Sequence, residues 1–186
     1  MHTGTVNRIP PQNLSELWPA EDRPAPPRGG TEAEVLGGYL DWHRRTLEAK
    51  CGGLTPGQLS ARSVAASSLS LHGLVRHLAG VERWWLRIQF AGEDLPLLYY
   101  SDEDPDQDFD RLDGDPAEAF AVWRAEVERS REIVAAAGSL DEAGTEERSG
   151  EPVELRAVLV KLIAEYARHN GHADLLRESI DGATGH

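Results

Sequence analysis

Apolar residues recur every three to four positions along four stretches of the chain, and this spacing predicts amphipathic helices. The four predicted helices cover residues 31–50, 71–90, 116–137 and 152–180. Thr31 and Glu34 have the spacing of a capping box at the start of the first helix, and a glycine follows each helix within two residues. No stretch shows a convincing two-residue alternation, so the pattern predicts an all-α protein, a four-helix bundle.

The second and third predicted helices are separated by a long acidic connection, residues 93–115. Eight of its acidic residues crowd between positions 102 and 115, where we expect them to be solvated. A connection of this length can cross the end of a bundle. We therefore expect a long crossover connection between helices 2 and 3.

The 186 residues are enough for one domain. Six of the eleven prolines lie within the first thirty residues, and proline favours extended backbone without helix hydrogen bonds. The predicted organisation is a proline-rich arm over residues 1–30, the bundle over 31–182 and a short tail over 183–186.

Acidic residues outnumber basic ones by 32 to 19, which gives a formal net charge of −13. This balance argues against binding to nucleic acid and to anionic membrane surfaces, because both need a basic protein surface. We find no signal-peptide pattern and no apolar stretch long enough to span a bilayer. The single cysteine, Cys51, excludes an internal disulfide and has no visible base beside it. We expect a cytoplasmic protein.

Three ionisable residues interrupt the apolar stripe of the fourth predicted helix. The stripe reads Leu155, Val158, Leu162, Glu165, His169, His172 and Leu176. A carboxylate buried there without a partner would cost several kcal/mol, so the three residues need compensation.

Helix geometry limits which of these residues can share one metal ion. Glu165 and His169 differ by about 40° and 6 Å along the axis, and His169 and His172 by about 60° and 4.5 Å. Glu165 and His172 lie about 10 Å apart, so all three are not expected to bind one ion. A third ligand must come from another helix, and His77 lies on the apolar stripe of the second. His43 has a similar place on the first.

A structural interpretation competes with the metal site. A lone histidine on an apolar face, such as His43 or His77, is more often a core residue, and Glu165 could pair with Lys161 or Arg168. Three ionisable residues on one stripe, together with a histidine on a second helix, favour a metal site. Inward-facing Glu and His side chains often form metal sites in helical bundles. One carboxylate and two imidazoles fit catalytic zinc, and iron, nickel and manganese stay open.

Two segments resemble the DinB superfamily: His77-Leu-Ala-Gly-Val-Glu-Arg-Trp-Trp85, and Glu165-Tyr-Ala-Arg-His169-Asn-Gly-His172-Ala-Asp174. The likeness extends over about residues 39–182 and is closest to a branch that includes mycothiol-dependent enzymes. It implies a four-helix bundle with a long crossover, a homodimer, and a divalent metal held by His77, Glu165 and His169. Many members have histidine at the position of Glu165. His172 has no settled role in that pattern. It could contact a metal ligand without binding the ion, transfer a proton, or be an alternative ligand.

The leading functional hypothesis is a metal-dependent transferase that joins a low-molecular-weight, mycothiol-like thiol to a small electrophile. Zinc would stabilise the thiolate, with His172 as the catalytic proton acceptor. The alternatives are a hydrolase in which the ion activates water, a metal or ligand sensor, and a structural clamp between helices two and four.

Weaker candidate signals lie elsewhere. Asp104, Asp106 and Asp108 have the spacing of a calcium loop, but Phe109 replaces the required glycine, so we do not expect one. Arg131 could hold a substrate carboxylate, although pairing with the neighbouring Glu128 or Glu132 is favoured.

Trp84 and Trp85 are adjacent, so in an α-helix their side chains point about 100° apart. We expect one to pack inside and the other to line a pocket or a dimer surface. His2, His72 and His186 lie outside the apolar stripes, and we assign them no role.

Overall fold

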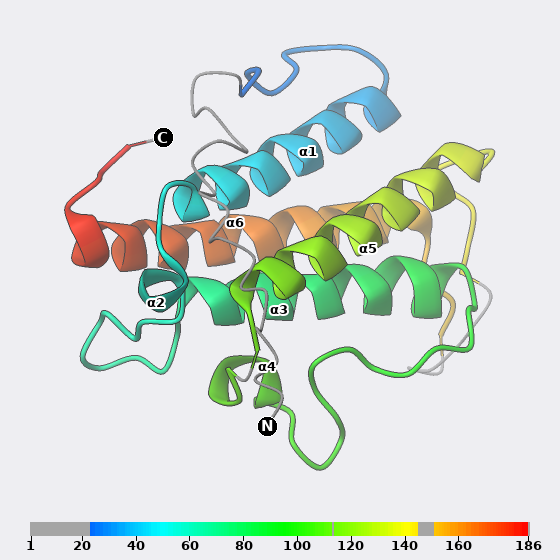
Figure 1. Cartoon of the computed structure of the whole chain (residues 1–186). Helices are drawn as coiled ribbons and strands as arrows, with labels where there is room; N and C mark the ends of the chain where they lie inside the picture. Colours follow the sequence, from blue (N-terminus) through cyan, green and yellow to red (C-terminus); the bar gives the residue numbers. More distant parts are fainter. Residues whose placement is uncertain (1–22, 113, 145–150, 186) are drawn as a thin grey trace, which may run out of the picture.

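The computed structural model describes residues 23–112, 114–144 and 151–185. Four long helical segments make up the bundle in this part of the chain: α1 (Glu32–Cys51), α3 (Leu71–Glu82) continued by η3 (Arg83–Phe90), α5 (Pro116–Ala136) and α6 (Leu155–Asp181). α1 packs along α6, and α3 packs against both α5 and α6 (Figure 1). The predicted all-α bundle is confirmed.

The helix ends follow the expected local chemistry. Thr31 and Glu34 form the predicted capping box, and Gly182 ends α6 in the left-handed region at φ 77°. α6 begins at Leu155, three residues later than predicted, because Glu154 instead pairs with Ala143 in an isolated β-bridge.

Two short helices were not predicted. α2 (Pro56–Leu59) lies in a turn-rich stretch, where Thr55 and Gln58 form a second capping box. α4 (Gln107–Asp110) lies in the acidic crossover and packs against α3. The crossover is therefore partly folded onto the bundle.

The second predicted helix is continuous but changes type at Arg83, where α3 passes into the π-helix η3. π-helical turns are rare and often occur at functional sites. Because a π-turn is wider than an α-turn, successive side chains point in less divergent directions than in an α-helix.

A buried polar cluster joins the four helices near their middle, and we call it the Glu82 cluster. The Glu82 carboxylate accepts hydrogen bonds from Arg44 Nε at 2.8 Å, from Arg44 Nη2 at 2.7 Å and from the Tyr166 hydroxyl at 2.7 Å. The Trp123 indole donates to the Tyr166 hydroxyl at 2.8 Å. Each helix contributes one residue, so the cluster fixes the register of all four.

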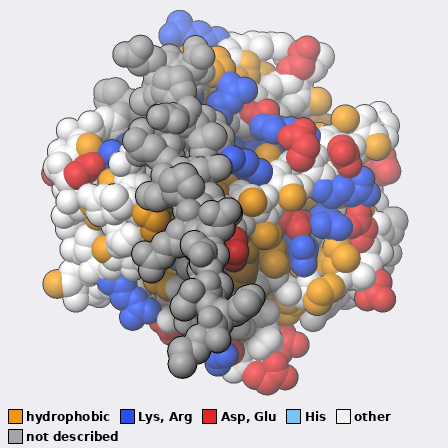
Figure 2. All heavy atoms as spheres, in the orientation of Figure 1, with side chains coloured by type: hydrophobic (Ala, Val, Ile, Leu, Met, Phe, Trp, Pro, Cys, Tyr) orange, Lys and Arg blue, Asp and Glu red, His pale blue; other side chains and the backbone are white. Residues whose placement is uncertain are grey.

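The described part of the predicted arm, residues 23–30, runs beside α1, where Arg23 bonds Thr46 and Pro27 lies against Gly38. Basic and acidic side chains lie interspersed on the described part of the face in Figure 2. No helix in the described ranges has the length and apolar character needed to cross a membrane. His2, His186 and the arm before residue 23 lie outside the described residues.

Candidate metal centre

His77 lies on the face of α3 that packs against the crossover, between glycines at positions 73 and 80. A Cβ atom at Gly80 would lie 2.9 Å from the carbonyl oxygen of Leu98, and one at Gly73 would lie 3.2 Å from the Phe109 ring. Spacings of four and three residues place both glycines on the His77 face. The missing side chains let the crossover approach this histidine closely.

Asp108, from α4 in the crossover, contacts His77 directly. Its Oδ2 accepts a hydrogen bond from His77 Nδ1 at 2.7 Å, and the residue is only 2% exposed. Arg76 holds this segment by donating to the carbonyl oxygens of Asp108 at 3.2 Å and Gln107 at 3.3 Å. α3 therefore carries His77 and also anchors the carboxylate that orients it.

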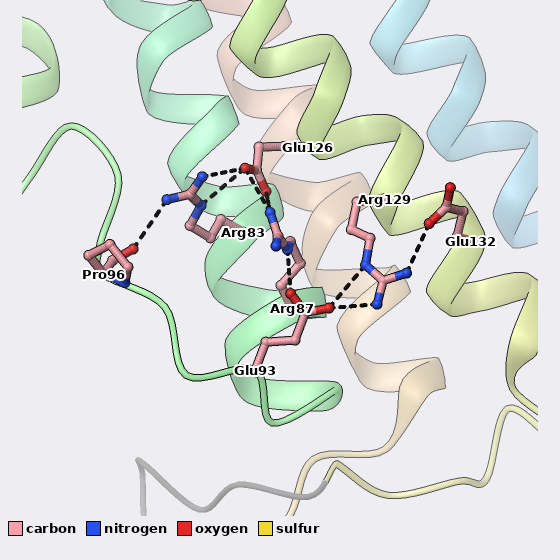
Figure 3. Close-up of polar contacts among 7 residues, drawn as sticks. All are labelled: Arg83, Arg87, Glu93, Pro96, Glu126, Arg129 and Glu132. Carbon is pink, nitrogen blue, oxygen red and sulfur yellow. Dashed lines mark hydrogen bonds and ion pairs between the residues drawn. The ribbon is translucent and has the colours of Figure 1, made fainter.

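The beginning of the crossover is anchored by ion pairs at the other end of the same helical segment (Figure 3). Glu126 on α5 accepts from Arg83 Nη2 at 2.5 Å and from Arg87 Nη1 at 3.1 Å. Arg83 also donates to the carbonyl oxygen of Pro96 at 3.3 Å, and Arg87 binds Glu93 at 2.7 Å. Contacts at both of its ends hold the crossover beside His77.

Glu165 and His169 occupy successive turns of α6 and meet His77 across the helix interface. Glu165 Oε2 lies 3.5 Å from His169 Nε2, and the rings of His77 and His169 have centroids 4.6 Å apart. One potential ligand atom from each of the three residues lies within 4.8 Å of the others. The structure thus brings together the three residues predicted as metal ligands.

In each of these three side chains, the second polar atom contacts a further residue. Asp108 binds His77 Nδ1 at 2.7 Å, and Lys161 binds Glu165 Oε1 at 2.9 Å. His172 lies 3.4 Å from His169 Nδ1. Outer contacts of this kind orient metal ligands and select the tautomer of a histidine. The remaining atoms, Nε2 of both histidines and Oε2 of Glu165, are the ones available to a common ion.

His77 Nε2 provides a test of whether a metal fits here. This nitrogen is buried and has no hydrogen-bond partner among the described residues. A buried polar atom without a partner costs free energy, and a metal ion would supply the missing partner. Two imidazoles and one carboxylate match a zinc site that keeps an open position, and also suit iron, nickel or manganese.

The electrostatics of the cluster favour the protonation states that ligands need. Burial, together with His77 and His172, lowers the pKa of His169 to about 4, so its imidazole is neutral near pH 7. Partial burial acts to raise the pKa of Glu165, but Lys161 and the two histidines hold it below its ordinary value. A neutral imidazole and an ionised carboxylate are the metal-binding forms.

The other histidines on the described helices have core contacts of the kind the structural interpretation expects. His43 Nδ1 lies 3.4 Å from Asn170 Nδ2, and its ring packs edge-on against Trp42. His72 is buried, with its Nδ1 3.1 Å from Ser60 Oγ. Neither belongs to the cluster of His77.

The expectation of a uniformly solvated acidic crossover was wrong at Asp108, which is buried against His77. Asp104 instead pairs with Arg111 at 2.6 Å, so two of the three aspartates with calcium-loop spacing have other partners. The crossover thus contributes a contact to a candidate ligand that acidic composition alone does not distinguish.

Arg131 pairs with Glu128 at 3.0 Å, as favoured, and also with Asp41 at 3.0 Å, which we did not predict. Cys51 is buried, and burial raises the pKa of its thiol, which opposes a nucleophilic role.

Trp84 and Trp85 both line one pocket beside His77, whereas we expected only one of them to face a pocket. Both belong to η3, where the wide π-turn reduces the angle between adjacent side chains. Trp85 also packs against the hydrophobic core, so it combines the two expected roles.

A family model described as mycothiol-S-transferase matches residues 35–182. The chain belongs to the mycothiol-S-transferase family. This family is part of the DinB-like superfamily, which confirms the resemblance inferred from the two helical segments. The match covers the bundle, the crossover and every residue of the candidate metal centre. Neither a curated protein nor a solved structure matched the chain.

For this mycothiol-S-transferase family member, Asp108 is the site residue that sequence reasoning missed. One sequence signal pointed to it indirectly, because Gly73 and Gly80 flank His77 on one helix face and indicate a closely packed segment. Nothing in the spacing of the crossover aspartates identifies which of them packs there.

Proposed function

We propose that this protein is a metal-dependent transferase that joins the sulfur of mycothiol, or of a mycothiol-like thiol, to a small electrophile. The family match supports the thiol chemistry. The observation that supports metal dependence is the buried, unpartnered His77 Nε2 within reach of Glu165 and His169.

In this proposal His77, Glu165 and His169 hold a divalent ion, with zinc as the leading candidate. When bound, the ion supplies an open coordination position and favours the thiolate form of the thiol. Asp108 accepts the Nδ1 hydrogen of His77 and so keeps its Nε2 lone pair available. Lys161 holds Oε1 of Glu165, which leaves Oε2 toward His169.

The geometry of His172 narrows its proposed role. If His169 uses Nε2 as a ligand, its Nδ1 carries the hydrogen, and His172 Nδ1 is the acceptor at 3.4 Å. His172 can take a proton from the thiol at Nδ1 only by giving up this contact. We therefore propose that His172 first positions His169, and that proton acceptance is its second candidate role.

His172→Ala separates these two roles. If His172 positions His169, we expect the variant to bind metal about 10- to 100-fold more weakly than the wild type. Competition with a chromophoric chelator measures this affinity. If His172 instead accepts a proton, we expect the variant to keep the metal affinity of the wild type but to have a lower kcat and an altered pH–rate profile.

The central experiment uses full-length protein purified without an affinity metal. Elemental analysis identifies the metal, and the protein is then incubated with a bromobimane and mycothiol, bacillithiol or glutathione. We expect conjugation of mycothiol that is lost on chelation and restored by zinc. Absence of conjugation with all three thiols, in protein shown to contain metal, would rule out the transferase.

The clamp alternative is tested by His169→Ala. A structural clamp predicts a large fall in the melting temperature of the purified protein. A transferase site predicts lost activity on a fold that survives. The homodimer and the cytoplasmic location stay predictions, and light scattering tests the first.

A further inference from the structure

A pocket opens beside His77, between η3 and the crossover. Its volume is about 180 Å³, and four aromatic side chains line it: Trp84, Trp85, Tyr100 and Phe109. A cavity of roughly 150 Å³ is enough to take up benzene. The pocket can therefore hold a group about the size of one aromatic ring.

The pocket lies directly beside the candidate metal centre. Phe109, one of its aromatic residues, stacks on the His77 ring with centroids 4.9 Å apart and planes inclined by 27°. His77 itself and Asp108 form part of the lining. A group bound here would lie next to the residues proposed to hold the metal.

The side chains around the pocket disfavour an anion, and the charge of the proposed divalent ion at His77 is offset by the carboxylates of Glu165 and Asp108. Asp106 and Asp108 line it, and none of the described lining residues is Lys or Arg. Lys161 Nζ lies 5.9 Å from the centre of the Trp85 ring, but it is paired with Glu165 at 2.9 Å. A carboxylate entering the pocket would lose water and meet the negative faces of aromatic rings.

Size indicates which of the two substrates this pocket takes. A thiol whose scaffold is larger than one ring would exceed a volume of about 180 Å³. A small electrophile with one ring matches the volume and the apolar lining, and stacking on the tryptophans would stabilise it.

The inference that follows rests on the proposed function: we propose that this pocket binds the electrophile and selects an uncharged aromatic group over one that carries a carboxylate. With benzyl chloride, the thiolate sulfur donates an electron pair to form a bond to the benzylic carbon. The carbon–chlorine bond breaks, chloride leaves with its electron pair, and the thiol proton passes to solvent.

The first test compares benzyl chloride with 4-(chloromethyl)benzoate, using mycothiol and the zinc-loaded, full-length protein. Each kcat/KM is divided by the rate constant of the uncatalysed reaction with the same thiol. We expect a preference of about tenfold or more for benzyl chloride, which corresponds to about 1.4 kcal/mol. A ratio near one, or a preference for the carboxylate, would overturn the proposal.

Asp106→Lys tests whether the preference comes from the pocket. Asp106 is exposed, lines the pocket and makes no capping hydrogen bond to α4. Asp102→Lys is the matched control, because Asp102 is an exposed acid of the same crossover that does not line the pocket. We expect the preference for benzyl chloride to fall several-fold only in Asp106→Lys. Equal changes in both variants would contradict a pocket effect.

Trp84→Leu tests which substrate occupies the pocket. If the electrophile binds there, the KM for benzyl chloride rises several-fold and the KM for mycothiol does not change. The reverse result would assign the pocket to the thiol and overturn the proposal.

A binding measurement separates this proposal from the proposed transferase activity. Calorimetry without thiol compares 4-nitrobenzyl alcohol with 4-nitrobenzoate, and we expect tighter binding of the uncharged compound. If this preference holds while no thiol is conjugated, the transferase is wrong, and only the pocket's preference for an uncharged aromatic group stands. If transfer occurs but the two compounds bind equally, the pocket assignment is wrong.

Discussion

Two polar clusters lie between α3 and α6, and they differ in whether their atoms are satisfied. In the Glu82 cluster, the carboxylate accepts from Arg44 and Tyr166, and Tyr166 accepts from Trp123. In the cluster of His77, a buried imidazole nitrogen has no partner among the described residues. A fully paired cluster serves the fold, whereas an incompletely paired one is suited to a ligand.

The two clusters are neighbours in sequence. Glu165 and Tyr166 are adjacent on α6 but face different partners, and His77 and Glu82 lie five residues apart on α3. The two clusters differ in exposure, because the Glu82 side chain is fully buried whereas that of His77 is 24% exposed. They also differ in that the His77 cluster contains a buried nitrogen without a partner among the described residues.

The largest expected effect is on stability, from Glu82→Leu. This change removes the buried partner of the Arg44 guanidinium and leaves only the partly exposed Asp41 at 3.0 Å, so we expect a cost near the low end of about 3–5 kcal/mol. Burial lowers the pKa of Arg44 and Glu82 raises it, so the variant loses the raising effect. An arginine side chain nevertheless stays protonated in proteins, so its charge remains in the variant's interior. Urea unfolding at pH 7.5 measures the loss. Glu128→Gln, at an exposed ion pair, is the control and should cost less than about 1 kcal/mol.

The second effect is on metal content, from His77→Ala. We expect stoichiometric metal in the wild type and none in the variant, because a site with two ligands left binds far more weakly. Zinc should raise the melting temperature of the wild type but not that of His77→Ala, since a ligand stabilises the state that it binds. His43→Ala is the control, with its histidine outside the cluster, and should keep the metal. Equal metal content in both variants would contradict the site.

The third effect is on metal affinity, from Asp108→Asn. Loss of the carboxylate that accepts from His77 Nδ1 should weaken zinc binding about 10- to 100-fold. Competition with a chromophoric chelator measures the affinity directly, without an activity assay. Asp110→Asn, on the same short helix but paired with Arg62, should bind zinc like the wild type.

The smallest effect is a pH dependence of stability that arises outside both clusters. Burial, followed by Arg76, lowers the pKa of His72 from 6.5 to about 4. Between these values the unfolded chain binds a proton that the folded chain does not, so the free energy of unfolding falls as the pH falls. At pH 5.5 the loss relative to neutral pH is about 1 kcal/mol.

His72→Asn should remove this part of the pH dependence and leave zinc affinity unchanged. Urea unfolding at pH 7.5 and 5.5 gives the difference for both proteins. An identical difference in wild type and variant would show that His72 is not responsible.

The helices were predictable because their signals are local. The stripe from Leu155 to Leu176 has the period of a helix face, and its apolar members are buried as expected. The capping box at Thr31 and the glycine at position 182 mark helix ends through backbone chemistry alone. The π-turn at Arg83 could not be predicted, since the sequence there keeps ordinary helical periodicity.

The grouping of His77, Glu165 and His169 was predictable in part for the same reason. Two of these residues are four apart on one helix, and the third breaks the apolar stripe of another. The sequence did not distinguish His77 from His43, which occupies a similar stripe position. In the structure His77 faces His169 whereas His43 contacts Asn170, so tertiary packing separates the two. The resemblance to a family had already indicated His77.

The sequence by itself determined the helices, their buried faces and the ionisable residues that interrupt those faces, because each depends on neighbours within one or two turns. Tertiary structure alone decided that Asp108 orients His77, that Asp41 pairs with Arg131, and that both tryptophans line one pocket. These contacts join residues far apart in the chain. Their formation depends on how the crossover and the helices pack, which no local spacing encodes.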